Sequence, residues 1–207
     1  RDALAVATRK GFTFFDRQTD CANEERRFEG ECVDDARAEA RRLQTLVDQG
    51  IDPREQKAER IAAAEAKRAA AEGMRVVMAD IEAPALADAV AEIQATGAAA
   101  IGVVTDVANE ASIQALADRA FEEFGAVHML CNNAGVSGGG GPSWEIPDNA
   151  WQWTFGVNLW SVVYALRAFI PRMIEQGEGH VVNTASSAGL KTLPFVAPYA
   201  ATKHAVV

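Results

Sequence analysis

The fold is decided by three short apolar runs, which read RVVMAD at residues 75–80, AAIGVV at 99–104 and VHMLC at 127–131. Each run has the length of a buried strand, and segments with helical periodicity lie between them at 85–96 and 112–124. Strands that alternate with helices are typical of βαβ units, in which the strands run parallel. The sequence therefore predicts an α/β protein with a doubly wound parallel sheet.

A long helical pattern and a fourth strand follow the third apolar run. The helix is expected from Asp148 to about Gln176, with Asp148 capping its start and Pro171 kinking or breaking it near its end. The next apolar run, HVVNTA at residues 180–185, predicts a further strand of the same sheet.

Polar side chains come at or just past the carboxyl ends of these predicted strands. In open parallel sheets, ligands bind beyond the carboxyl ends, where the loops leave the sheet. We therefore expect one binding site to be surrounded by Asp80, Asp106, Asn132 and Ser186.

Tyr199 and Lys203 form a candidate catalytic pair, and Ser186 lies 13 residues before the tyrosine. Residues four apart on a helix share one face, so both side chains can reach one site. A tyrosine phenol titrates near pH ~10, and a neighbouring ammonium lowers that pKa by favouring the phenolate. The pair can then act as general acid in a reduction and as general base in an oxidation. The alternative is a surface tyrosine and a solvated lysine on an ordinary helix.

The stretch from about residue 69 to 207 resembles the short-chain dehydrogenase/reductase family. The resemblance implies a Rossmann-like fold and an NAD(P)-dependent oxidoreductase that moves a hydride between nicotinamide and a secondary alcohol or ketone. The motifs that carry it are Asp106-Val107, Asn132-Asn133-Ala134-Gly135, Asn158, Ser186 and Tyr199-Ala200-Ala201-Thr202-Lys203.

The same resemblance implies a role for each catalytic residue. Tyr199 transfers the proton, while Lys203 lowers the pKa of Tyr199 and binds the nicotinamide ribose. Ser186 holds and polarises the substrate oxygen, with Ser187 as the less favoured alternative. Asn158 orders a water that extends the proton path.

NAD is the expected cofactor, and NADP is less favoured. Asp80 at its strand end suits hydrogen bonds to the adenosine ribose hydroxyls and would repel a 2′-phosphate; the alternative is a plain turn residue. By the resemblance, the adenine is bordered by Asp106 and Val107, and the ribose by Asn132, Ala134 and Gly135, with Tyr199 and Lys203 also contacting the cofactor.

One feature of the family is missing from the sequence. The family begins with a strand and a glycine-rich turn, Thr-Gly-x-x-x-Gly-x-Gly, whose backbone approaches the cofactor pyrophosphate. No such pattern occurs here. We therefore expect the central strand, between 75–80 and 127–131, to be absent too. The segments that follow the Tyr-Lys helix in the family are also missing, so we expect an incomplete domain, and a catalytically dead fragment is the alternative.

Residues 1–72 predict a helical N-terminal extension of unrelated origin, joined to the partial dinucleotide-binding and catalytic domain at 73–207. They hold 14 of the 20 Lys and Arg residues but only three of the 16 glycines. A hairpin is expected from Leu4 to Phe15, and a helix from Asp52 to Glu72 as a solvated spacer.

Residues from about 34 to 70 resemble the N-terminal region of phage-integrase-type tyrosine recombinases. The alternative function is therefore a chimera of a dehydrogenase with a recombinase-like DNA-binding segment. Residues 1–72 carry 16 acids against 14 bases, however, so a nucleic-acid partner is not expected. The similarity lies in Ala36-Arg37-Ala38-Glu39-Ala40-Arg41 and Gly50-Ile51-Asp52-Pro53-Arg54.

Composition excludes several other classes of protein. The formal net charge of −9 argues against a nucleic-acid surface, and no apolar run is long enough to span a bilayer. The three cysteines and three histidines lack ligand spacing, so we expect no metal and a reducing cytoplasm. The helix at 148–176 has more apolar residues than one stripe can bury, which predicts self-association.

Overall fold

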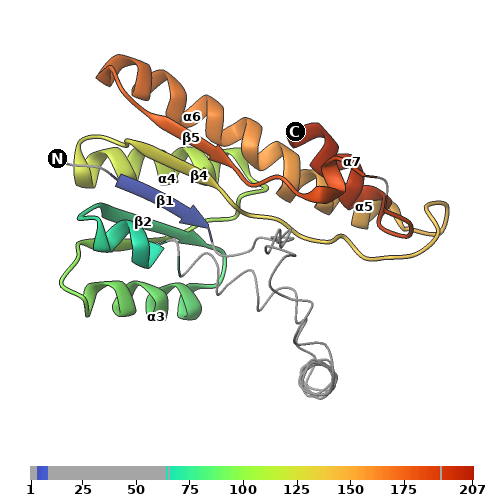
Figure 1. Ribbon diagram of the computed structural model, residues 1–207, viewed down its shortest axis with the longest axis horizontal. Coiled ribbons are helices and arrows are strands. Elements are labelled where there is room, and N and C mark those ends of the chain that lie inside the picture. Colours follow the sequence, from blue (N-terminus) through green and yellow to red (C-terminus); the bar gives the residue numbers. More distant parts are fainter. Residues whose placement is uncertain (1–3, 9–63, 65, 192) are drawn as a thin grey trace, which may run out of the picture.

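The computed structural model describes residues 4–8, 64, 66–191 and 193–207, which form a five-stranded parallel sheet with helices on both faces (Figure 1). The order of the strands in the sheet is β3-β2-β1-β4-β5. The predicted doubly wound, Rossmann-like sheet is therefore confirmed. The strands are β1 (Leu4–Thr8), β2 (Arg75–Asp80), β3 (Ala100–Val104), β4 (Met129–Asn132) and β5 (His180–Asn183).

The helices follow the strands in the alternation that the sequence predicts. The expected helices at 85–96 and 112–124 are present with slightly earlier starts, and the long helix is present in three consecutive pieces. The helical elements are α3 (Ala83–Gln94), α4 (Glu110–Phe124), α5 (Asp148–Phe155), the π-helical turn η1 (Gly156–Trp160), α6 (Ser161–Gln176), the 3₁₀ turn η2 (Ser187–Gly189) and α7 (Ala197–Val206).

The central strand is present, so the expected gap in the sheet is wrong. β1 lies between β2 and β4, with Val6 opposite Val77 on one side and Leu130 on the other. Both edges of β1 are paired. The second strand of the expected hairpin, residues 12–15, lies outside the described residues. The expected absence of β1 rests on the glycine-rich turn that follows this strand in the family and is missing from this sequence. A strand needs apolar residues and two vacant neighbouring edges, and neither depends on that turn.

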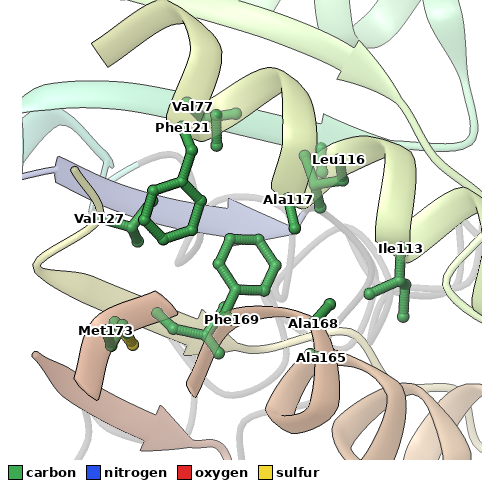
Figure 2. Packing of buried hydrophobic residues seen from close by; sticks show 13 residues of the cluster. Val77, Ile113, Leu116, Ala117, Phe121, Val127, Ala165, Ala168, Phe169 and Met173 are labelled. Atoms are coloured by element: carbon green, nitrogen blue, oxygen red, sulfur yellow. The ribbon is translucent and has the colours of Figure 1, made fainter. Parts of the chain in front are cut away.

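One face of the sheet is covered by α4 and α6, which share a core with it (Figure 2). The predicted apolar stripe of α4, with Ile113, Leu116 and Ala117, is buried against this face. Phe121 of α4 and Phe169 of α6 meet with ring centroids 6.1 Å apart. This core holds the long helix along the sheet, with its first turns near the carboxyl ends of the strands and Gln176 beside Val127 at their amino ends.

The other face is covered by α3 and by the helical residues 66–71. Ala66 and Ala70 are buried against a cluster that includes Met78 of β2 and Ile93 of α3. The expected solvated spacer is therefore wrong for these last two turns before Gly73. Alanines at i and i+4 have little volume, which allows a helix to approach a sheet closely.

The long helix differs from the prediction in how it begins and bends. Pro147 occupies the N-cap position and Asp148 is the first helical residue, so Asp148 does not cap the helix. Pro171 lies inside α6 without ending it, although proline has no backbone N–H for the helical hydrogen bond. The irregularity is instead the π-helical turn at Gly156–Trp160.

The other sequence-based expectations for the N-terminal part lie outside the described residues. These are most of the recombinase-like segment and the part of the expected Asp52–Glu72 helix that precedes residue 64. The division of the chain at residue 72 stays a prediction. Among the residues that are described, no helix is long and apolar enough to cross a membrane.

Candidate active site

A cavity of about 130 Å³ lies at the carboxyl ends of β2, β3 and β4. Four of the residues predicted to contact a cofactor line it together, namely Asp80, Asp106, Val107 and Ala134. They come from three different strand ends, which the parallel sheet brings to one edge. Asp80 and Asp106 therefore share a site, as predicted from the strand ends, whereas Asn132 and Ser186 are not among the residues that line this cavity.

The two acids at this cavity also hold their own turns. The backbone N–H of Glu82 donates to Oδ1 of Asp80 at 2.8 Å, and that of Ala108 donates to Oδ1 of Asp106 at 3.0 Å. Asp80 is buried and Asp106 is exposed. Asp80 thus serves as a turn residue and lines the cavity at the same time, so the two interpretations of this aspartate are compatible.

The Asn-Asn-Ala-Gly segment ties β4 to β5 where both strands end. Nδ2 of Asn132 donates to Oδ1 of Asn183 at 2.8 Å, and the Thr184 hydroxyl donates to Oδ1 of Asn133 at 2.7 Å. Asn132 lines a separate, smaller cavity of about 20 Å³ behind Ala134. Gly135 is buried next to Ala134. Ala134 is thus the member of this segment that the two cavities share.

Ser186, Tyr199 and Lys203 come together where η2 packs against α7. The hydroxyl of Ser186 accepts a hydrogen bond from the backbone N–H of Ala188 at 3.1 Å and lies close enough to the Tyr199 phenol to lower its pKa. Nζ of Lys203 lies 5.9 Å from the centroid of the Tyr199 ring. The structure therefore brings together three of the four residues predicted to be catalytic, and Asn158 reaches Tyr199 through Thr202.

Close packing between η2 and α7 depends on Gly189. A Cβ at this position would lie 2.5 Å from the carbonyl oxygen of Lys203, which is backbone and cannot move aside easily. The glycine thereby brings the turn that carries Ser186 against the helix that carries Tyr199. This contact holds the serine and tyrosine side chains within reach of each other.

Burial dominates the electrostatics of this cluster. Burial raises the pKa of Tyr199 above its ordinary value of 10.0, and the hydrogen bond with Ser186 offsets part of the rise. Burial also lowers the pKa of Lys203 to about 8. The expected net lowering of the Tyr199 pKa is therefore wrong for this structure. The lysine ammonium donates to the carbonyl oxygen of Thr184 at 2.7 Å, and the loss of water around the phenol is the largest influence on the pKa of Tyr199.

Asn158 is buried, with 1% of its surface exposed, and its side chain joins three segments. Its Oδ1 accepts from the N–H of Val136 at 2.7 Å, and its Nδ2 donates to the Val136 carbonyl at 2.9 Å and to Oγ1 of Thr202 at 3.1 Å. Thr202 in turn donates to the carbonyl of Tyr199 at 2.8 Å. Asn158 therefore holds the segment after β4 against the helix that carries Tyr199. Its predicted role in ordering a water stays a prediction.

Thr184 and Thr202 are the residues that sequence reasoning did not single out. Thr184 binds both Asn133 and Lys203, and Thr202 binds both Asn158 and Tyr199. Thr202 lies within the Tyr-to-Lys motif and Thr184 lies two residues before Ser186, so their proximity to the motifs was the available signal.

The fold belongs to the class of doubly wound nucleotide-binding proteins, with Tyr199 and Lys203 buried beside Ser186 at its carboxyl edge. The family model described as short chain dehydrogenase matches residues 57–207. The chain therefore belongs to the short-chain dehydrogenase family.

Individual relatives agree with this assignment. A 1-deoxy-11-beta-hydroxypentalenate dehydrogenase of Streptomyces avermitilis is 44% identical over 140 residues, which cover 67% of this chain and 52% of that protein. A short-chain dehydrogenase/reductase from Burkholderia phymatum in complex with NAD is 39% identical, with a TM-score of 0.72, and the match covers 99% of this chain and 56% of that one.

An actinorhodin polyketide ketoreductase with NADPH also shares the fold, with a TM-score of 0.72 and 25% identity over 99% of this chain and 61% of that one. Solved neighbours therefore include one with NAD and one with NADPH. The chain spans about half the length of the curated relatives that it matches.

Proposed function

We propose that this chain carries the catalytic centre of a nicotinamide-dependent oxidoreductase, which transfers a hydride between the cofactor and a secondary alcohol or ketone. The observation that carries the proposal is the cluster of Ser186, Tyr199 and Lys203 at the edge of the sheet where the acid-lined cavity opens. Membership of a family whose relatives are named as dehydrogenases supports it.

The described residues fit one end of a dinucleotide. Asp80 offers a carboxylate for the adenosine ribose hydroxyls, and Val107 and Ala134 offer apolar walls beside it. For the pyrophosphate, residues 9–72 contain only Gly11, Gly30 and Gly50, which lack the spacing of a glycine-rich turn. The cofactor would therefore be held chiefly through its adenosine and nicotinamide ends, the second by Tyr199 and Lys203.

The proton path begins at the phenol of Tyr199. In the oxidation, the phenolate takes the hydroxyl proton of the alcohol while the carbon loses its hydrogen as a hydride and becomes a carbonyl. Nicotinamide, when bound, supplies the acceptor or donor of that hydride. Because burial raises the pKa of Tyr199, the phenolate needs the Lys203 ammonium as its counter-charge.

Ser186 and Asn158 support this step in different ways. The Ser186 hydroxyl already lies within hydrogen-bond reach of Tyr199, so a substrate oxygen beside the phenol can accept a hydrogen bond from it. Asn158 fixes the helix of Tyr199 through Thr202, which limits the positions open to the phenol.

We propose NAD rather than NADP as the preferred cofactor, because the Asp80 carboxylate would repel a 2′-phosphate. Asp80→Ser should lower the ratio of kcat/KM for NAD to that for NADP by about tenfold or more. Asp88→Ser, which changes an exposed acid of α3, should leave the ratio unchanged. An unchanged ratio in the Asp80 variant would contradict the assignment.

Label transfer tests the proposed reaction directly. The full chain is incubated with NAD and a secondary alcohol that carries deuterium on its carbinol carbon, and the reduced cofactor is examined by mass spectrometry. The proposal requires the deuterium to appear in the nicotinamide. An unlabelled cofactor across a panel of alcohols, with the reverse reaction also silent, favours the alternative of a catalytically dead fragment.

We also propose that the chain associates with itself through the outer face of the long helix. Trp160 stacks on Tyr164 with ring centroids 6.0 Å apart, and Trp160 and Ile174 remain exposed. Exposed apolar side chains of this size favour association. Light scattering at micromolar concentration should therefore detect species larger than one chain, and a stable monomer would contradict the proposal.

A further inference from the structure

We propose that Trp153 forms an aromatic wall on which the base of a bound adenine nucleotide stacks. The inference rests on the proposed function, because it assigns the acid-lined cavity to the nucleoside end of the cofactor. It adds a residue that comes from the long helix rather than from a strand end. It also explains a large side chain that the packing of the fold does not use.

Trp153 lines the cavity while half of its surface stays exposed. It shares the cavity with Val157, four residues later on the same helix, and with Ile81 at the end of β2. Trp153 is 50% exposed and Ile81 is 53% exposed. Two large apolar side chains that line one cavity and remain half exposed leave apolar surface for a ligand to cover.

A close helix contact keeps Trp153 beside the strand ends. Gly156 lies against Ala108, and a Cβ on this glycine would come 3.4 Å from the Ala108 methyl. Ala108 belongs to the loop after β3 that also carries Asp106 and Val107. The start of the long helix is thus held against this loop, one turn after the tryptophan.

The chemistry of the lining favours a flat base with a polar sugar. Asp80 and Asp106 supply acceptors for hydroxyl groups, while Val107, Ile81 and Trp153 supply apolar surface in the same cavity. Every base has a π-face that can stack on an aromatic ring, and loss of such a ring weakens binding by a factor of about 5 to 150.

The other tryptophans of the chain have different surroundings and provide controls. Trp160 stacks on Tyr164, and Trp151 lies against Phe155 with ring centroids 6.2 Å apart. Trp144 is 83% exposed on the loop before α5. Trp144 is therefore the matched control for a change that removes a tryptophan without touching the cavity.

AMP is the probe, because it carries the base without the nicotinamide. Titration of the full chain with AMP, followed by tryptophan fluorescence and by ligand-detected NMR, should show binding with quenching. Trp153→Leu, which keeps apolar bulk, should weaken AMP binding about 5-fold or more and abolish the quenching. Trp153→Phe should keep most of the affinity, and Trp144→Phe should keep both affinity and quenching. Ribose 5-phosphate, which lacks the base, should bind wild type and Trp153→Leu alike.

Several results would overturn the inference. One is that the wild-type chain does not bind AMP. Others are that wild type and Trp153→Leu bind AMP with equal affinity, or that AMP still quenches the tryptophan fluorescence fully in Trp153→Phe. Loss of AMP binding in Trp153→Phe as well as in Trp153→Leu would also count against stacking. None of these results depends on turnover. If AMP binds through Trp153 but deuterium transfer fails, the proposed reaction is wrong and the site for the base stands. If deuterium is transferred but AMP binding does not depend on Trp153, the proposed reaction stands and only the role of Trp153 is wrong.

Discussion

Replacing Asn158 with alanine should destabilise the protein strongly, because it removes the partners of two buried backbone groups at once. Val136 is buried, and the Asn158 amide is the hydrogen-bond partner described for both of its backbone groups. The Val136 N–H donates to Oδ1 of Asn158 at 2.7 Å, and the Val136 carbonyl accepts from Nδ2 at 2.9 Å. A buried polar group left without a partner costs about 1–3 kcal/mol. Two such groups predict a loss of about 2–6 kcal/mol in the free energy of unfolding.

The assay is urea unfolding of the wild type and the variant, followed by circular dichroism at fixed pH. Asn149→Ala is the matched control, because Asn149 is an exposed asparagine on the neighbouring helix and should change stability by about 0.5 kcal/mol at most. The loss expected for Asn158→Ala is a large share of the roughly 5–15 kcal/mol by which a folded domain is stable. Thr202→Val gives a milder second variant if Asn158→Ala does not fold.

The double variant tests the link between the two side chains. Asn158 and Thr202 touch at 3.1 Å, so their effects should be non-additive by about 0.5 kcal/mol or more. A loss below about 1 kcal/mol for Asn158→Ala, with an unchanged dependence on urea, would refute the reasoning. Strict additivity of the two changes would refute the coupling to the helix of Tyr199.

Three further predictions concern pH, packing and affinity. The pKa of Lys203 is near 10.5 in the unfolded chain and about 8 in the folded protein, so the unfolded chain binds more protons between these pH values. The free energy of unfolding should therefore rise by up to about 3 kcal/mol from pH 8 towards pH 10, and urea titrations of Lys203→Met should lack this rise. Gly138 has φ +72°, and a Cβ there would lie 1.8 Å from Oγ1 of Thr154, so Gly138→Ala should lower the free energy of unfolding by about 2 kcal/mol or more. A Cβ on Gly139 would meet nothing within 4 Å, so Gly139→Ala should lower it by about half of that or less. Calorimetry should find NAD binding no tighter than about millimolar, since the glycine-rich turn is missing, and micromolar binding would show that other residues replace it.

The sheet could be predicted because its signals are local. The run from Arg75 to Asp80 gives β2 its bounds without reference to any other part of the chain. The acids at the strand ends follow from the same pattern, since parallel strands bring their carboxyl ends to one edge. The gathering of Asp80 and Asp106 around one cavity therefore required no knowledge of tertiary contacts. Of the other two residues that the same pattern places at that site, Asn132 lines a separate cavity and Ser186 joins the cluster with Tyr199 instead.

The position of β1 could not be predicted in this way. Leu4–Thr8 is a short run, and its place in the sheet is set by edges that β2 and β4 leave vacant more than 60 residues later in the chain. Pairing of this kind depends on the whole sheet. A missing turn after the strand is a weak argument against the strand itself.

The chemistry of the site depends on burial, which sequence spacing does not report. The four-residue spacing correctly placed Tyr199 and Lys203 together, yet the pKa of the tyrosine moves opposite to the expected direction because water is excluded around it. The bonds of Asn158 likewise depend on a π-helical turn. Such turns insert one residue into a helix and leave no clear mark in its periodicity.

The most direct test of the proposed function compares the only two tyrosines of the chain. Tyr199→Phe keeps the ring and removes the proton, whereas Tyr164→Phe makes the same change on the long helix, away from the cluster. Turnover is measured by the absorbance of the reduced nicotinamide with an alcohol that shows label transfer. The account predicts a fall on the order of 10² or more for Tyr199→Phe and near wild-type turnover for Tyr164→Phe. Unchanged turnover in Tyr199→Phe would contradict the assignment of the proton to this tyrosine.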